Sequence, residues 1–194
     1  PGGWTLTLAD GRRLRAERLV NAAGAWADVV AQRCGSAPQG LQPKRRSAFT
    51  FDAPAGLDAR GWPVTAAIDE RWYFKPDAGQ LLGSPANADP VPPHDVVAEE
   101  LDIATAIHAL GEDTTLQIRR PRRTWAGLRT FSRSGELVIG AAAQGLFWLA
   151  GQGGYGIQSA QGAAVLAAGL LCGTALDDAL RGQQVVPGAM APVG

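Results

Sequence analysis

The chain has 194 residues, of which 46% are hydrophobic and 19% are charged, so it can bury a core and is typical of a globular protein. Its 18 basic and 18 acidic residues give a formal net charge of zero, which argues against a nucleic-acid-binding protein or one held at an anionic membrane surface. The two cysteines, Cys34 and Cys172, lie in helical-looking segments, and no Cys/His spacing resembles a zinc site. The sequence therefore predicts a cytoplasmic protein without a bound metal ion.

The N-terminal residues predict the beginning of a sheet. Residues 4–8 alternate with the period of a strand, Asp10 and Gly11 predict a turn, and residues 12–18 predict the returning strand of a hairpin. A short buried strand over residues 18–22 follows, and small residues lead from it into a helix over residues 25–34. Because the chain opens on a proline without a basic start or an apolar leader, we expect a piece of a longer protein and no signal peptide.

Residues 43–133 differ in character from the segments on either side. They contain Pro- and Gly-rich connections, one amphipathic helix predicted over residues 94–111, and short predicted strands over residues 48–51, 72–75 and 80–84. This change predicts an inserted domain, with residues 1–42 and 134–194 together forming the other domain.

The C-terminal third carries no charged residue between positions 137 and 176. A strand is predicted over residues 146–150 and a helix over residues 157–171, with a glycine-rich turn between them. Gln158, Ser159 and Gln161 lie in that helix, so we interpret the segment as a buried strand and helix and expect no integral membrane segment. The residues after position 173 show little periodicity and predict a tail.

The turn over residues 151–156 is suited to holding a large electron-rich or anionic cofactor. Glycines allow positive φ and close approach of the backbone, and the N-terminus of the next helix presents unpaired N–H groups and partial positive charge. Gly151, Gly153 and Gly156 also satisfy G-x-G-x-x-G, the dinucleotide-binding pattern. Two alternatives remain open: a nicotinamide-binding Rossmann unit, for which Asp177 and Asp178 lie in no predicted strand, and a tight turn between buried elements.

Four segments, taken in order, resemble one enzyme family. They are Asn-Ala-Ala-Gly-Ala-Trp-Ala at 21–27, Tyr-Phe-Lys-Pro at 73–76 followed by Gly-Gln-Leu-Leu-Gly at 79–83, Trp-Ala-Gly-Leu-Arg at 125–129, and Gly-Gln-Gly-Gly-Tyr-Gly at 151–156. Together they resemble the C-terminal half of the FAD-dependent D-amino-acid oxidase, glycine oxidase and sarcosine oxidase family, over about residues 4–173. The family's own N-terminal GxGxxG, which seats the FAD pyrophosphate, has no counterpart in this sequence.

The resemblance implies an incomplete FAD-oxidoreductase fold of the α+β class. Residues 1–42 and 134–194 would form part of an α/β FAD-binding domain, and residues 43–133 a substrate-binding domain with a mixed, largely antiparallel sheet and helices. It implies an FAD-dependent enzyme that oxidises the CH–N bond of an amino acid or secondary amine by hydride transfer to flavin N5. Electrons would then pass to oxygen or another acceptor.

The resemblance also assigns roles to individual residues. Arg129 would grip the substrate carboxylate with two parallel hydrogen bonds, and Tyr73 would face the same carboxylate. Gln152 stands where several relatives have histidine, so the charge beside the flavin would differ. The implied FAD contacts are Ala23, Gly24, Gly151, Gln152, Gly153, Gly154, Tyr155, Gly156 and Ile157.

Each assignment has a plainer alternative. Arg129 could be a surface arginine paired with an acid, Tyr73 a half-buried strand residue, and Ala23 with Gly24 a site of helix–strand packing. Because only Trp125 provides an aromatic side chain beside the basic cluster around Arg129, we interpret that cluster as a solvated basic face rather than a phosphate-binding patch. The cluster consists of Arg119, Arg120, Arg122, Arg123 and Arg133.

Two other functions remain open from the sequence. The same fold and cofactor serve FAD-dependent dehydrogenases of 2-hydroxy acids or glycerol phosphate, because the substrate pocket decides the reaction. The chain could also be a non-catalytic binding module without flavin, or a fragment that is inactive alone.

Overall fold

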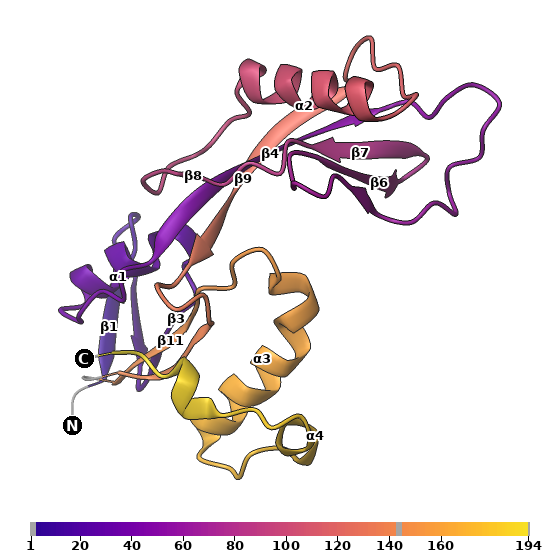
Figure 1. The fold of residues 1–194 in the computed structure, drawn as a ribbon. Helices are drawn as coiled ribbons and strands as arrows, with labels where there is room; N and C mark the ends of the chain where they lie inside the picture. Colours follow the sequence, from indigo (N-terminus) through magenta and orange to yellow (C-terminus); the bar gives the residue numbers. More distant parts are fainter. Residues whose placement is uncertain (1–2, 143–144, 194) are drawn as a thin grey trace. The chain divides into compact units, whose positions relative to one another are not determined.

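The computed structural model of the chain describes residues 3–142 and 145–193, which fall into two compact units (Figure 1). Unit 1 comprises Pro1–Pro43 and Arg129–Gly194, and unit 2 comprises Lys44–Leu128. Strands β4 (Gln42–Phe51) and β9 (Arg123–Phe131) carry the chain from one unit into the other. Helices and largely antiparallel sheets occur together, which confirms the predicted α+β class.

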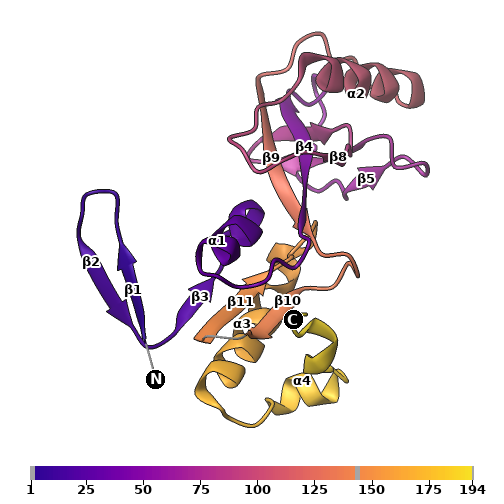
Figure 2. The ribbon, with the colours of Figure 1, turned by 90° about the vertical axis from the view of Figure 1, so that its left-hand side faces the viewer.

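Unit 1 is built on a three-stranded sheet with helices on both of its faces (Figure 2). The central strand β11 runs antiparallel to β10 on one side and parallel to β3 on the other. A 3₁₀ turn, η1, leads into α1 after β3, and α3 follows β11. The bounds are β3 Leu19–Asn21, η1 Gly24–Trp26, α1 Ala27–Arg33, β10 Val138–Ala141, β11 Leu146–Ala150 and α3 Gly156–Cys172.

The alternation of β11 explains these layers. Leu146 and Trp148 are fully buried in a cluster with Ala27 and Ala31 of α1, whereas Phe147, between them in the strand, packs with Leu166 of α3. Successive side chains of a strand point to opposite faces, so one apolar strand fills the contacts with both helices. The predicted strand over residues 146–150 is confirmed.

Helix α3 is more exposed than its uncharged sequence predicts. Only Leu166 and Ala167 are buried, and Ile157 at its start is 98% exposed. The expectation of a buried helix is therefore wrong, because α3 contacts the sheet through a single face. Among residues 3–142 and 145–193, no helix has the length and apolar character needed to cross a membrane.

The residues after Gly173 are not the tail that the sequence predicts. They form α4 (Asp178–Gly182) and a 3₁₀ turn, η3 (Pro187–Met190). Leu180 and Met190 pack onto the cluster between α3 and the sheet. Val193 exchanges two hydrogen bonds with the Gln39 side chain, at 2.7 and 2.9 Å. These elements are too short to show a hydrophobic period, so they could not be predicted from local patterns.

An N-terminal hairpin completes unit 1, with β1 (Trp4–Thr7) antiparallel to β2 (Arg13–Ala16) as predicted. Unit 2 has a six-stranded sheet in the order β5-β6-β7-β4-β8, with β9 also paired to β4. Every pairing along that order is antiparallel. The bounds of the remaining elements are β5 Thr65–Ala66, β6 Tyr73–Asp77, β7 Gln80–Ser84, β8 Asp89–Pro90 and α2 Glu100–Asp113.

Helix α2 covers one face of the unit 2 sheet (Figure 1) and closes an aromatic core. Phe49 is fully buried there, and Trp72 stacks on Phe74 with ring centroids 5.9 Å apart. Gly83 makes room for this core, because a Cβ at that position would lie 2.7 Å from Cζ of Phe49. The predicted strand over residues 80–84 is β7.

The helix predicted over residues 94–111 begins six residues later, at Glu100. Glu99 has an extended backbone (φ −85°, ψ 137°), and its carboxylate is ion-paired with Arg45 of β4. Arg45 also pairs with Asp102 in the first turn of α2, at 3.3 Å. These ion pairs lie at the start of the helix, and the local apolar pattern could not reveal them because Arg45 is distant in sequence.

Candidate functional site

The candidate site lies at one edge of the unit 1 sheet. Strands β3 and β11 are parallel neighbours, with Trp148 opposite Asn21, so the segments that follow them leave the sheet at the same edge. In open α/β sheets, ligands bind at the carboxyl ends of the strands. Two of the sequence-predicted cofactor segments, residues 23–24 and 151–157, are thus brought to one edge.

The first segment is held by Asn21, which is 2% exposed. Its Nδ2 donates to the carbonyl oxygen of Ala27 at 2.8 Å, and its Oδ1 accepts from the amide of Ala23 at 3.4 Å. Gly24 has a φ of +56°, and a Cβ built there meets no atom within 4 Å. Asn21 therefore fixes a corner at which the backbone of Gly24 faces open space.

The second segment is a glycine turn with two residues in the left-handed region, Gly151 (φ +75°) and Gly153 (φ +54°). The amide of Gly153 donates to the carbonyl oxygen of Thr130 at 2.8 Å, which ties the turn to the end of β9. A Cβ on Gly153 would lie 2.9 Å from Cε1 of Phe131. Both the backbone conformation and this close approach require glycine here.

Arg129 lies against the same turn. A Cβ on Gly154 would be 2.8 Å from Nη1 of Arg129, so the guanidinium lies directly against the backbone of the turn. The guanidinium also lies over the ring of Phe131, 5.5 Å from its centroid, a distance at which a cation and an aromatic face attract each other. The structure thus brings Arg129 together with the predicted cofactor turn inside unit 1.

The N-terminus of α3 follows the turn directly. Among residues 3–142 and 145–193, no side chain forms a capping hydrogen bond at this end, and the first N–H groups of an α-helix have no acceptor within the helix. The Tyr155 hydroxyl donates to the carbonyl oxygen of Gly135, and burial, followed by the negative charge of Glu136, raises the pKa of Tyr155. This end therefore presents partial positive charge, with Tyr155 kept neutral beside it.

Two further predicted residues flank the turn. Gln152 is half-buried, and its Cβ lies 3.1 Å from where a Cβ on Gly156 would be, so Gly156 allows the chain to fold back over Gln152. Ile157 opens the helix with its side chain almost wholly exposed. Packing within unit 1 shapes the backbone of the turn, whereas the side chain of Ile157 is open to solvent.

Tyr73, the other predicted substrate residue, belongs to unit 2. It lies in β6 between the buried Trp72 and Phe74, so its side chain points to the sheet face opposite that core. The guanidinium of Arg46 lies 5.8 Å from the centroid of its ring. Because Arg129 and Tyr73 belong to different units, their joint action on one carboxylate stays a prediction.

The sequence analysis missed three residues that shape these surroundings: Asn21 at the first corner, Phe131 beneath Arg129, and Arg46 over Tyr73. Phe131 could have been found, because residues two apart in a strand share a face and Arg129 lies two positions before it. Arg46 could not, since its contact with Tyr73 joins two strands. Asn21 carried only a weak signal as a polar residue in an otherwise apolar strand.

Comparison with known proteins agrees with this geometry. The family model described as FAD dependent oxidoreductase (DAO) matches residues 1–170. The chain belongs to this FAD-dependent oxidoreductase family. The family resemblance predicted from the sequence is confirmed, and so is FAD as the family's cofactor.

Solved structures show the same fold. Glycine oxidase from Geobacillus kaustophilus matches 90% of this chain with a TM-score of 0.72 and 23% identity. Iminodiacetate oxidase from Chelativorans sp. BNC1 matches 95% with a TM-score of 0.72 and 23% identity, and L-amino acid deaminase from Proteus vulgaris matches 96% with a TM-score of 0.75 and 13% identity. The matches cover 47%, 48% and 53% of those chains, so this chain spans about half their length.

The carboxyl edge of the unit 1 sheet fits part of an FAD molecule. An uncapped helix N-terminus suits an electron-rich or anionic group, and the open space at Gly24 admits one close to the backbone. Among the residues that the structure describes, no group of His, Cys, Asp and Glu side chains is placed to hold a metal ion.

Proposed function

We propose that the protein is an FAD-dependent oxidoreductase that oxidises the CH–N bond of an amino acid or secondary amine. The observation that supports this most is the position of Arg129, whose guanidinium lies against Gly154 of the turn that leads into α3. An arginine can bind a carboxylate, and here it lies beside the helix N-terminus proposed to contact the flavin. This arrangement suits a substrate whose carboxylate is attached to the carbon that is oxidised.

In this proposal, unit 1 contributes to the FAD-binding domain and unit 2 to the substrate-binding domain. Ala23 and Gly24 would lie along the cofactor at the first corner. At the second segment, the backbone from Gly151 to Ile157, including Gln152, Gly153, Gly154, Tyr155 and Gly156, would lie against the flavin ring. Bound FAD supplies the hydride acceptor. The dipole of α3 would stabilise negative charge that develops on the ring, because its positive end points toward the turn.

Arg129 would bind the substrate carboxylate through two parallel hydrogen bonds and so orient the α-carbon. The ring of Phe131 restrains the guanidinium from one side, which reduces the conformational entropy lost on binding. Tyr73 would donate its hydroxyl to the same carboxylate. The product would be an imine, which water hydrolyses, and electrons would pass on to oxygen or another acceptor.

The test is a visible absorption spectrum of the purified protein, recorded without oxygen before and after addition of glycine, sarcosine and a panel of D-amino acids. The proposal predicts a flavin band that bleaches with at least one amine. A band that bleaches only with 2-hydroxy acids or glycerol phosphate, without ammonia release from amino acids, would contradict it. A protein that binds no flavin would support a binding module instead.

The role of Arg129 is tested by Arg129→Lys, which keeps the charge but loses the planar fork. Loss of a charged hydrogen bond costs about 1.5–3 kcal/mol, so kcat/KM for the amino acid should fall roughly 10- to 150-fold. An amine substrate without a carboxylate should be affected far less. Arg181→Gln is the matched control, because Arg181 is exposed in the same unit and pairs with Asp178 at 2.7 Å. Equal losses for both substrates would show that Arg129 acts only through packing.

A further inference from the structure

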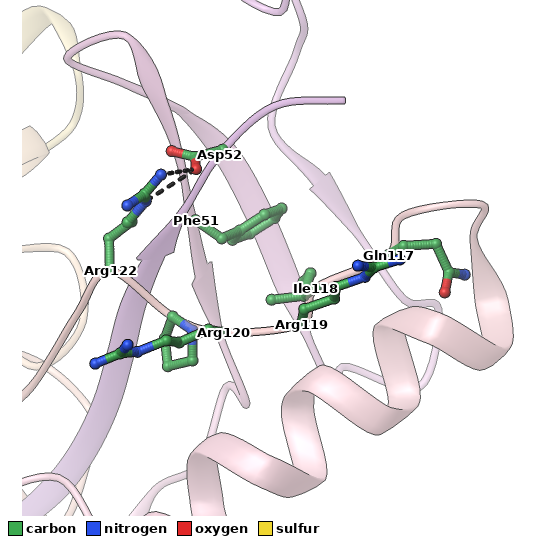
Figure 3. A pocket seen from close by; sticks show the side chains of 8 residues that line it. Phe51, Asp52, Gln117, Ile118, Arg119, Arg120 and Arg122 are labelled. Atoms are coloured by element: carbon green, nitrogen blue, oxygen red, sulfur yellow. Dashed lines mark hydrogen bonds and ion pairs between the residues drawn. The ribbon is translucent and has the colours of Figure 1, made fainter. Parts of the chain in front are cut away.

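A pocket lies in unit 2 and is lined by residues that have no role in the proposed oxidation (Figure 3). It has a volume of about 540 Å³ and lies between the end of β4, at Phe51 and Asp52, and the segment over residues 117–122. Figure 3 shows Arg122 reaching Asp52, while the side chain of Arg120 extends away from that pair. Ile118 and Pro121 add apolar surface to its lining.

The charges around this pocket are not balanced. Four arginines occupy residues 119–123, and a single carboxylate, Asp52, pairs with one of them: Nε of Arg122 donates to Oδ2 of Asp52 at 2.9 Å. This hydrogen bond lowers the pKa of Asp52, which keeps it ionised. Within the part of the chain that the structure describes, Arg119, Arg120 and Arg123 form no ion pair, and all three are exposed.

The rest of unit 2 differs in this respect. Residues 44–128 contain ten Lys and Arg against twelve Asp and Glu, so the unit as a whole is not basic. Carboxylates pair with cations elsewhere in it, namely with Arg45, Arg60, Arg71 and Lys75. Arg46 instead donates to the carbonyl oxygen of Asn87 at 2.6 Å. Three of the unit's described arginines without an ion pair, Arg119, Arg120 and Arg123, thus lie close together in sequence at the pocket, where their positive charge is expected to attract anions.

We propose that this pocket, lined by Phe51, Asp52 and residues 117–122, binds a small organic anion with two or more carboxylate or phosphate groups. Arg119 and Arg120 each carry a planar guanidinium that can donate two parallel hydrogen bonds to one carboxylate or phosphate group. Two cations without a carboxylate partner favour a ligand with more than one negative charge. The volume lies within the range of small-molecule sites, and the apolar lining fits a carbon skeleton between the anionic groups. The exposure of these arginines agrees with the sequence interpretation of a solvated basic face, and the proposal adds a ligand to that face.

The test is isothermal titration calorimetry of the intact protein at low ionic strength with citrate, pyrophosphate and acetate. We expect saturable binding of citrate or pyrophosphate at one site and none of acetate. Tighter citrate binding would indicate a carboxylate ligand, and tighter pyrophosphate binding a phosphate ligand. Absence of saturable binding for both polyanions, or equal binding of acetate, would overturn the proposal, as would much tighter binding of a single-stranded oligonucleotide.

The double substitution Arg119→Gln and Arg120→Gln should weaken binding at least tenfold while leaving thermal unfolding unchanged, because both side chains are exposed. Arg60→Gln is the matched control, since Arg60 is an exposed arginine of the same unit that is paired with Asp58 at 2.8 Å. It should leave the dissociation constant within twofold. An equal loss in both variants would show nonspecific attraction and overturn the site. Neither variant should change oxidation of an amine, so this result is independent of the proposed function.

Discussion

The core of unit 2 and the carboxyl edge of the unit 1 sheet use glycine in opposite ways. At Gly83 the space of a missing Cβ is filled by the ring of Phe49, a fully buried side chain of the same unit. At Gly24 that space is empty to 4 Å, and the backbone has a positive φ. Where another side chain of the protein occupies the position of the missing Cβ, the glycine allows close packing. Where that position is open at the end of a strand, a ligand can approach the backbone.

The packing of Phe49 against Gly83 is tested by removing the Phe49 ring. Phe49→Ala removes a fully buried ring from the aromatic core, so the free energy of unfolding should fall by about 3–5 kcal/mol. Urea denaturation measures this loss. A change below about 1 kcal/mol would mean that the core does not depend on this ring.

Gly83→Ala should also destabilise the protein, by about 1–3 kcal/mol, because the added methyl group would lie 2.7 Å from Cζ of Phe49. The contact predicts coupling between the two positions. In a Phe49→Leu background the cost of Gly83→Ala should shrink, and a double-mutant cycle measures the difference. Strictly additive losses would show that the ring is not what excludes a side chain at position 83.

Gly24→Ala tests whether the space at Gly24 is open in the protein without FAD. Its only cost should be the left-handed backbone, about 1–2 kcal/mol, since the methyl group meets no atom. Gly56 provides a matched control, with a φ of +79° and equally open space. In the absence of FAD, thermal unfolding should report the same loss for Gly24→Ala and Gly56→Ala. A much larger loss at position 24 would reveal a packing role there.

The smallest effect concerns Tyr155 beside the α3 terminus. Its pKa is raised in the folded protein, so the stability it contributes is complete below the ordinary value near 10 and is lost as the pH rises above about 10. Tyr155→Phe should cost about 0.5–1.5 kcal/mol at neutral pH, through the hydrogen bond to Gly135, and should make alkaline unfolding less steep. Identical pH profiles would contradict this account of Tyr155.

The sequence predicted those parts of the fold that local patterns determine. The strands predicted over residues 80–84 and 146–150 match β7 and β11. Residues 146–150 are an apolar run between Gly145 and Gly151, which needs no distant partner to be recognised. The start of α2 and the packing of α4 could not be predicted in this way. The former has ion pairs with Arg45 of a distant strand, and the latter depends on a surface that α3 and the sheet form only after folding.

The candidate site was predictable in its residues but not in its geometry. The glycine turn and Arg129 could be selected from motifs and resemblance. The contact between the guanidinium of Arg129 and Gly154 follows only from the approach of β9 to the turn, which brings together positions 25 residues apart. For the pocket lined by residues 117–122, the cluster of arginines is recognisable in the sequence. The cavity beside it arises from the fold and could not be predicted.

We propose that the turns after β3 and β11 together form one FAD-binding edge. The most direct measurement is the FAD dissociation constant of Gly24→Ala compared with that of Gly56→Ala, determined by quenching of flavin fluorescence. We expect the methyl group at position 24 to weaken FAD binding at least tenfold, while the equally strained control at position 56 binds FAD like the unmodified protein. Unchanged FAD affinity in Gly24→Ala, or equal weakening in both variants, would contradict it.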